Sequence, residues 1–216
     1  MKILNDFILS HKDIRGKTSL LVHLDCGCNL RCYKCYNYQD LVVDRDRLEW
    51  VRINKLFDFL NRDSHVYDYI ILSGGEPTLL GKKLVKLCDY LKDHYRIKVA
   101  LNTNGTRPEI LKELIEKRII DSVYMDLKFP FSNYNFNNYK KEWQLIYGLS
   151  YNQKIQSLIE ESLTLLYKSP IHFELRTVKY PFLKPSFLKK YTALVEELNQ
   201  KYRRKIVHNF NEFYLR

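Results

Sequence analysis

Strand-type and helix-type segments alternate along almost the whole chain, and this alternation limits the folds that the chain can adopt. Short apolar runs typical of strands occupy Thr18–Leu24, Tyr67–Leu72, Ile97–Leu101, Asp121–Leu127, Ile171–Val178 and Lys205–Phe210. Between them, apolar residues recur at helical spacing in Leu48–Leu60, Leu84–Leu91, a segment that starts at Pro108, Ile155–Leu166 and Phe187–Leu198. Thr106 is placed to cap the helix that Pro108 begins. This order predicts a parallel sheet covered by helices.

The number of strand–helix units predicts the shape of that sheet. Six units are too few to close an eight-stranded barrel, so we expect an α/β fold with a partial (β/α)6 TIM-like barrel that is open on one side. The chain has 216 residues, which fit a single domain over residues 1–216. Functional residues of such folds gather at the carboxyl ends of the strands, and the gap could admit a bulky or macromolecular substrate.

The segment 129–151 interrupts the alternation. It is long, rich in Asn and Tyr, and contains Phe136, Tyr139 and Trp143. Long loops in compact domains are usually functional or disordered, and the aromatic content argues against disorder. We therefore interpret it as a loop insertion that docks a substrate or a partner.

The charge balance and the apolar pattern restrict the setting in which the protein works. The net charge is +11, from 36 Lys and Arg against 25 Asp and Glu. Such a surface attracts acidic partners, but the basic residues form no tract, so a solvated basic surface is a simpler explanation than nucleic-acid binding. No signal peptide opens the chain, and no apolar run approaches the roughly 20 residues that span a bilayer. We expect a soluble, cytoplasmic protein without membrane contact.

Four of the five cysteines fall within ten residues, directly after the first predicted strand. Three of them, Cys28, Cys32 and Cys35, have the spacing CxxxCxxC, which could wrap one corner of an iron–sulfur cubane and leave its fourth iron without a protein ligand. An open coordination position distinguishes catalytic from structural metal sites. The alternative is a zinc site with Cys26 as the fourth ligand, although this stretch is cramped for one tetrahedral ion.

The remaining cysteine and the histidines carry no metal-site signal. Cys88 lies on an apolar helical face, where a free cysteine behaves as a small hydrophobic residue. His23, His65 and His208 show no metal-ligand spacing. We interpret all four as structural residues.

A second motif, Ser73-Gly74-Gly75-Glu76-Pro77, follows the next predicted strand. Two glycines allow the backbone to approach a ligand closely, and the proline ends the strand. The carboxylate of Glu76 could hold an ammonium group through a charge-assisted hydrogen bond. By itself the motif is compatible with a plain turn, but one strand–helix–strand unit after the cysteines it forms a specific combination.

Together the two motifs resemble those of the radical S-adenosylmethionine superfamily. The resemblance implies that Cys28, Cys32 and Cys35 are catalytic and hold a [4Fe–4S] cluster. It also implies that Gly74, Gly75 and Glu76 bind the methionine amino group of S-adenosylmethionine. In the reaction that it implies, one electron from the cluster cleaves the S–C5′ bond, and the 5′-deoxyadenosyl radical abstracts hydrogen from a substrate.

Within the superfamily, the region from about Thr18 to Phe210 is most similar to glycyl-radical activating enzymes, especially those of anaerobic ribonucleotide reductase. Three further segments at predicted strand ends carry this similarity: Asn102-Thr103-Asn104-Gly105, Met125-Asp126-Leu127-Lys128 and Glu174-Leu175-Arg176-Thr177. The similarity implies contacts to the methionine carboxylate, the ribose or a monovalent cation by Asn102, Thr103, Asn104, Asp126, Lys128 and Arg176. Simpler alternatives are a surface ion pair of Asp126 with Lys128 and a pair of Arg176 with Glu174 on one strand face.

Two positions depart from the superfamily pattern. Lys34 stands where an aromatic residue usually precedes the last cluster cysteine, so Tyr33 or Tyr36, or backbone groups, would lie beside the adenine. We count Lys34 and Tyr36 among the cofactor-binding candidates. Asn102 replaces an acidic residue near the cation, which puts a cation site in doubt.

The leading hypothesis is an activase that installs a glycyl radical on a partner protein, with anaerobic ribonucleotide reductase as the first candidate. An acidic electron donor, such as a flavodoxin or a ferredoxin, would suit the basic surface. The alternatives are a small-molecule radical enzyme such as 7-carboxy-7-deazaguanine synthase, a tRNA-modifying radical enzyme, and a non-enzymatic zinc module that binds nucleic acid.

Overall fold

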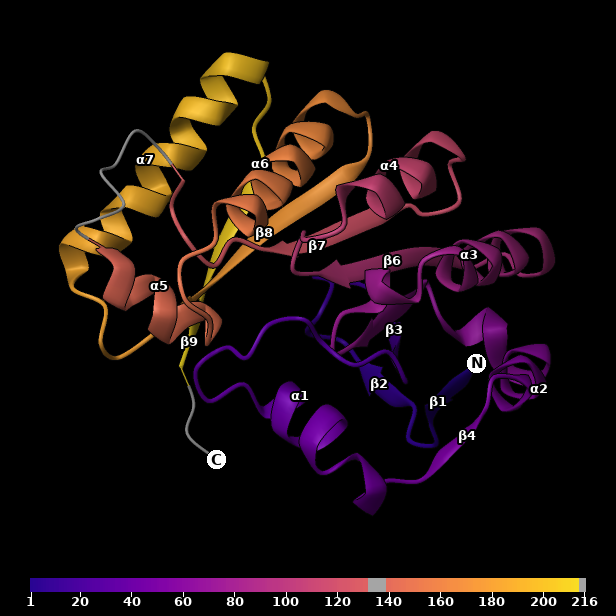
Figure 1. Cartoon of the computed structure of the whole chain (residues 1–216). Helices are drawn as coiled ribbons and strands as arrows, with labels where there is room; N and C mark the ends of the chain where they lie inside the picture. The colour runs from indigo at the N-terminus through magenta and orange to yellow at the C-terminus, as the bar shows by residue number, and fades with distance from the viewer. Residues whose placement is uncertain (132–138, 214–216) are drawn as a thin grey trace.

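The computed structural model describes residues 1–131 and 139–213, and within them the strands form one mixed sheet (Figure 1). Six parallel strands make up the body of the sheet: β3 (Ser19–Leu24), β5 (Tyr69–Gly74), β6 (Lys98–Thr103), β7 (Ser122–Asp126), β8 (His172–Lys179) and β9 (Val207–Glu212). They lie side by side in the order of the sequence. In the described part of the chain β9 does not pair back with β3. The prediction of a partial barrel that is open on one side is confirmed.

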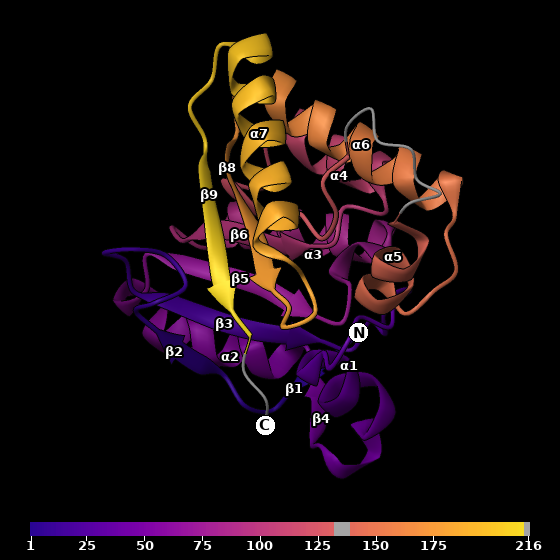
Figure 2. The same cartoon turned by 90° about the vertical axis from the view of Figure 1, so that its left-hand side faces the viewer.

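The helices cover the outer face of the sheet (Figures 1 and 2). Five of them connect neighbouring parallel strands, as predicted: α2 (Asn54–Asp63), α3 (Lys82–His94), α4 (Pro108–Glu116), α6 (Gln153–Lys168) and α7 (Pro185–Tyr202). Two others follow the carboxyl ends of β3 and β7: α1 (Tyr36–Tyr38), which continues into a π-helical segment at Gln39–Val43, and α5 (Lys140–Tyr147). None of the helices in the described ranges combines the length and apolarity that crossing a membrane requires.

Three short strands at the β3 edge of the sheet lie outside the predicted pattern. They are β1 (Lys2–Leu4), β2 (Ile8–Ser10) and β4 (Trp50–Arg52). β1 and β2 both pair antiparallel with β3, and β4 pairs antiparallel with β1. The predicted helix over Leu48–Leu60 is therefore wrong at its start, because helix α2 begins only after this strand.

Alternate residues of the parallel strands face the two sides of the sheet, and the two sides differ in polarity. On the outer side, residues such as Val22, Leu72 and Leu101 are fully buried in the main hydrophobic core. On the inner side, Ile71 and Ala100 belong to a second, smaller cluster of buried residues. Further along the same strands the inner positions become polar. The polar side chains thus lie toward the carboxyl ends, where the fold predicts the site.

Helix α4 begins at Pro108 as predicted, but Thr106 does not cap it. Arg107 occupies the N-cap position, without a side-chain hydrogen bond to the helix. The Thr106 hydroxyl instead donates to Asn104 Oδ1 at 2.7 Å and accepts from Asn29 Nδ2 at 2.8 Å. Thr106 therefore joins the loop after β6 to the loop after β3.

The segment 129–151 is not the predicted loop throughout, because part of it forms α5. Trp143 and Tyr147 of α5 are fully buried, and Phe129 packs against Trp143. The backbone N–H of Arg31 donates to the Tyr147 carbonyl at 2.9 Å, so α5 supports the cysteine loop. Phe136 lies outside the described residues, and a docking role for this segment stays a prediction.

The contact between β8 and β9 predicts an acid sensitivity. Thr177 Oγ1 donates to the Leu127 carbonyl at 2.7 Å, so His208 Nε2, 3.0 Å from the same oxygen, must be the donor of the second bond. Burial lowers the pKa of His208 to about 4, from an ordinary value of 6.5. The unfolded chain therefore takes up the extra proton first. The contribution of this histidine to stability is full above pH 6.5 and is lost as the pH falls toward 4.

We expect the free energy of unfolding to fall more steeply with decreasing pH in the wild type than in the variant His208→Gln. The glutamine amide keeps a donor but does not titrate in this range. Urea unfolding at several pH values between about 6.5 and 4 measures the two slopes. His65→Gln, at an exposed position, serves as the control. Equal slopes for the wild type and His208→Gln would contradict the prediction.

Candidate active site

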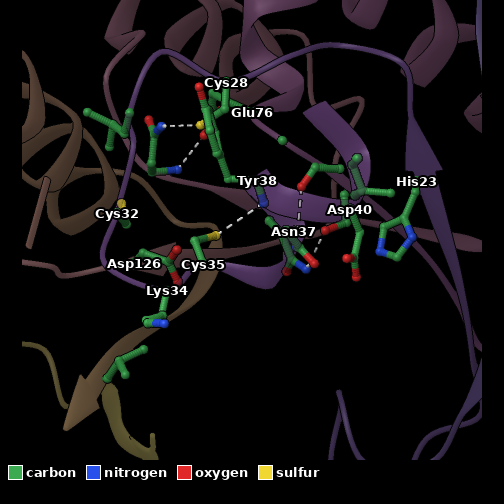
Figure 3. A pocket seen from close by; sticks show the side chains of 18 of the residues that line it. His23, Cys28, Cys32, Lys34, Cys35, Asn37, Tyr38, Asp40, Glu76 and Asp126 are labelled. Atoms are coloured by element: carbon green, nitrogen blue, oxygen red, sulfur yellow. Dashed lines mark hydrogen bonds between the residues drawn. The ribbon is translucent and has the colours of Figure 1, made fainter. Parts of the chain in front are cut away.

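A cavity of about 760 Å³ lies on the inner side of the sheet, at the carboxyl ends of the parallel strands. Cys28, Cys32 and Cys35, in and next to the loop after β3, line this cavity (Figure 3). The other predicted site residues that line it are Lys34, Gly74, Gly75, Glu76, Asn102, Thr103, Asn104, Asp126, Lys128 and Arg176. The side chain of Tyr36 lies outside the described part of the structure. The fold thus gathers residues from the ends of β3, β5, β6, β7 and β8.

Cys26 is separated from the other three cysteines, because it does not line the cavity. Burial, with a further contribution from Glu76, raises the pKa of its thiol to about 12. Over the described ranges, no three His, Cys, Asp or Glu side chains converge on a point that suits a single metal ion. This arrangement does not support the zinc alternative, which needs Cys26 beside the other three thiols.

The surroundings of the three thiols fit an iron–sulfur cluster. The backbone N–H of Tyr38 donates to Cys35 Sγ at 3.4 Å, and Asn104 Nδ2 approaches Cys28 Sγ at 4.0 Å. N–H groups directed at sulfur are among the features that set the potential of such clusters. Burial raises the pKa of the Cys32 thiol to about 11, so cluster assembly at neutral pH would release a proton from it.

The turn after β5 lies so close to the cysteine loop that only glycine fits. A Cβ added at Gly75 would lie 1.9 Å from the carbonyl oxygen of Gly27. At Gly74 the backbone has φ +139°, and an added Cβ would lie 2.6 Å from the Leu24 carbonyl oxygen. The next residue, Glu76, donates its N–H to the Gly27 carbonyl at 2.7 Å. The two motifs of the sequence are therefore in direct backbone contact.

The carboxylate of Glu76 is directed into the protein. It is 1% exposed and accepts hydrogen bonds from Thr103 Oγ1 at 2.7 Å and from the backbone N–H of Asn104 at 2.6 Å. It also accepts from the N–H of Thr78 at 3.2 Å and from the Thr78 hydroxyl. Burial raises the pKa of this carboxyl, against the lowering effect of these bonds. Glu76 thus ties the turn after β5 to the end of β6.

Asp126 and Lys128 form the predicted ion pair, but it is not an ordinary surface pair. Lys128 Nζ lies 2.7 Å from Asp126 Oδ2, and the lysine side chain is only 14% exposed. Burial opposes the charge of Lys128, yet Asp126 and Cys32 raise its pKa well above the ordinary value. A permanent positive charge therefore lies near Cys32 and faces the cavity.

Arg176 does not pair with Glu174, so that alternative is wrong. Its guanidinium donates to the Asp13 carbonyl at 2.9 Å and lies 4.2 Å from the centre of the Tyr124 ring. Glu174 accepts instead from Asn209 Nδ2 at 2.9 Å. Arg176 still lines the cavity, where the resemblance places it.

Tyr33 and Tyr36 are the two tyrosines near Lys34, and the structure describes the ring of Tyr33. Tyr33 lines the cavity. It packs edge-on against Phe182, with ring centres 5.2 Å apart, and against Tyr180 at 6.3 Å. Lys34 is exposed and has a left-handed backbone, with φ 48°. Tyr33 thus lies at the cavity together with the rings of Tyr38 and Tyr180.

Asn37 and His23 are among the polar residues that line the cavity but are absent from the predicted site. Asn37 Nδ2 donates to the Gly74 carbonyl at 3.3 Å, and its position two residues after Cys35 is the signal that could have revealed it. His23, interpreted as structural, also lines the cavity, on the side away from the cysteines (Figure 3). Its place near the carboxyl end of a parallel strand was the available signal.

Comparison with known proteins agrees with this geometry. Residues 24–147 match the family model of the Radical SAM superfamily. A protein of Methanocaldococcus jannaschii named "Putative glycyl-radical enzyme activating enzyme" is 30% identical over 173 residues, which are 80% of this chain and 66% of that protein. A "Probable GTP 3',8-cyclase" of Thermococcus kodakarensis is 25% identical over 76% of this chain and 49% of its own length. The chain thus spans about two thirds and about half of these relatives.

A solved structure shares the fold. The crystal structure of a radical SAM methyltransferase from Sphaerobacter thermophilus superposes with a TM-score of 0.59 over 92% of this chain and 67% of the other. The sequences are 11% identical, so this similarity concerns the fold alone.

Replacement of single cysteines should separate the cluster ligands from Cys26. We expect Cys28→Ala, Cys32→Ala and Cys35→Ala each to lose most of the iron and acid-labile sulfide after anaerobic reconstitution, because each removes one of three ligands. Cys26→Ala and the buried control Cys88→Ala should keep both. Iron and sulfide per chain are measured chemically. Loss of iron from Cys26→Ala as complete as from Cys32→Ala would refute the assignment.

Replacement of Gly75 by alanine should displace the cysteine loop. The added Cβ meets backbone atoms of Gly27, which no change of rotamer can move away. We expect a marked loss of reconstituted iron and a destabilisation of about 1–3 kcal/mol in urea unfolding. Gly16→Ala is the matched control, since its Cβ would meet nothing within 4 Å and only its positive φ is strained. If both variants bind equal iron, the contact at Gly75 does not position the loop.

Proposed function

Because this chain belongs to the radical SAM superfamily, whose cofactors are a [4Fe–4S] cluster and S-adenosylmethionine, we propose that it is an oxidoreductase that installs a glycyl radical on a partner protein. Anaerobic ribonucleotide reductase is our specific candidate for that partner. When bound, the two cofactors supply an electron and a 5′-deoxyadenosyl radical that abstracts hydrogen.

The observation that carries the proposal is that three thiols line one cavity together with the turn at Gly74 and Gly75, while the neighbouring Cys26 does not. Cys28, Cys32 and Cys35 would hold the cluster. The backbone of Gly74 and Gly75 would receive the methionine amino group, and Glu76 would hold that backbone in place, since its oxygens already accept four hydrogen bonds.

The remaining cavity residues would bind the other parts of S-adenosylmethionine. Lys128 and Arg176 present positive charge suited to the methionine carboxylate. Asp126 can accept from ribose hydroxyls while it pairs with Lys128. Asn102, Thr103 and Asn104, at and just after the end of β6, also line the cavity and would contact the methionine carboxylate or the ribose.

The open side of the barrel supports a protein segment as the substrate. Strands β2 and β9 border the gap of the barrel. The cavity reaches both borders, because Asp6 and Ile8 line it on the side of β2 and Asn211 and Glu212 line it on the side of β9. A gap bordered by strands on both sides suits an extended chain. The names of the relatives from Methanocaldococcus jannaschii agree with this choice.

A small-molecule radical enzyme is the second candidate, favoured by two relatives named "Probable GTP 3',8-cyclase". For the electron donor we propose an acidic flavodoxin or ferredoxin, because the net charge of +11 favours association with an acidic surface. We place the protein in the cytoplasm, where such carriers work.

Anaerobic assays test the proposal. We expect the reconstituted protein with dithionite to convert S-adenosylmethionine to 5′-deoxyadenosine, measured by mass spectrometry. With the partner reductase added, a glycyl radical signal should appear in electron paramagnetic resonance, and Cys32→Ala should produce neither. Cleavage that is stimulated by GTP and never gives a protein radical would favour the second candidate instead.

A further inference from the structure

Three polar side chains, His23, Ser73 and Asn102, lie in a row on the inner face of the sheet, and we call them the polar row. His23 on β3 and Ser73 on β5 are register partners, and Asn102 Nδ2 on β6 donates to Ser73 Oγ at 3.2 Å. All three line the cavity. Neighbouring strands lie about 4.8 Å apart, so the row crosses three strands and about 10 Å of the sheet.

Two buried atoms of the polar row, His23 Nδ1 and Asn102 Oδ1, have no hydrogen-bond partner among the described residues. A buried polar atom without a partner is destabilising, so such atoms are rare unless a ligand satisfies them. The amide nitrogen of Asn102 is engaged by Ser73, which leaves the carbonyl oxygen as an acceptor. The row therefore has two unpaired polar atoms, on side chains that line one cavity.

The polar row is uncharged. Burial lowers the pKa of His23, although Asp6 and Asp13 act in the opposite direction, so its ring is neutral and carries one N–H. The layer of the barrel next to the row is apolar and contains Ile71 and Ala100. A neutral group with one donor and one acceptor complements such a surface, and an amide is a group of this kind.

The bound amide group could belong to a peptide backbone or to the lactam edge of a guanine nucleotide. The charges in the cavity favour the peptide. Asp6, Asp13 and Glu212 line the same cavity and would repel a triphosphate. The basic groups Lys128 and Arg176 are assigned to the methionine carboxylate, so they are not available to a triphosphate as well.

We propose that His23 and Asn102 bind the backbone amide groups beside the glycine that loses hydrogen, with Asn102 Oδ1 accepting the peptide N–H and His23 Nδ1–H donating to the peptide C=O. This inference rests on the proposed function. The polar row thereby holds the substrate glycine, while one hydrogen atom moves from its Cα to the 5′ carbon of the 5′-deoxyadenosyl radical and leaves a glycyl radical.

The test uses the reconstituted holoenzyme with S-adenosylmethionine and dithionite. The probe is a capped alanine–glycine–alanine peptide that carries two deuterium atoms at the glycine Cα. Three quantities are measured: binding of the peptide by calorimetry, deuterium transfer to 5′-deoxyadenosine by mass spectrometry, and affinity for S-adenosylmethionine. The variants are His23→Phe and Asn102→Leu, which keep side-chain volume, and the matched control is His65→Phe at an exposed position.

We expect His23→Phe and Asn102→Leu each to weaken peptide binding about tenfold, the effect of one lost hydrogen bond. His23→Phe, which changes no residue assigned to S-adenosylmethionine, should alter iron content and affinity for S-adenosylmethionine less than twofold. His65→Phe should match the wild type. The inference is overturned if the wild type does not bind the peptide at millimolar concentration, if both variants bind it as the wild type does, or if GTP displaces it. Peptide binding that depends on the polar row without deuterium transfer would instead overturn the proposed function and leave the binding site standing.

Discussion

The close approach of the Gly75 backbone to the Gly27 carbonyl holds the cysteine loop against the sheet, and the rest of the site depends on it. Between the end of β3 and the start of α1 the loop has no regular structure of its own, so its position comes from its anchors. One anchor precedes each thiol in the sequence: the Gly27 carbonyl bonds to Glu76 N–H, the Arg31 N–H bonds to the Tyr147 carbonyl, and the Tyr33 ring packs in an aromatic cluster. The anchors lie after β5, on α5 and after β8. The spacing CxxxCxxC therefore specifies a site only together with distant parts of the chain.

The buried carboxylate of Glu76 extends this arrangement across the strand ends. Its four hydrogen bonds come from the turn after β5 and from the end of β6. Asn104, held by one of them, in turn directs its own amide to Asn29 at 3.1 Å and to Cys28 Sγ at 4.0 Å. A buried group of this kind is strongly destabilising if one partner is lost and rigid when all are present. The same residue type could bind a ligand or position the backbone, and burial favours the second role.

The sequence predicts the parallel part of the fold well, because β3, β5, β6 and β7 contain apolar runs, β8 alternates apolar and polar residues, and each connecting helix has an apolar face. It also predicts which residues meet at the cavity, since parallel strands bring their carboxyl ends together. Strands β1, β2 and β4 escape prediction because three residues carry no periodicity. Helix α5, within the predicted loop, escapes prediction because a buried Trp143 and an exposed one look alike in the sequence. The direction of the Glu76 side chain depends on Thr103 and Asn104, some 28 residues away along the chain.

The open barrel of six strands is closed at the amino-terminal side of the cavity by a separate element, the loop between β2 and β3. Ile14 of this loop packs against Ile71, Ala100 and Tyr124, and these form the smaller buried cluster on the inner side of the sheet. Arg176 fastens the loop, because it bonds to the Asp13 carbonyl and stacks on Tyr124. The guanidinium therefore lies at the boundary between an apolar plug and a polar cavity. The backbone carbonyl and the aromatic ring hold the guanidinium on the side of the plug, so Arg176 links the plug to the wall of the cavity.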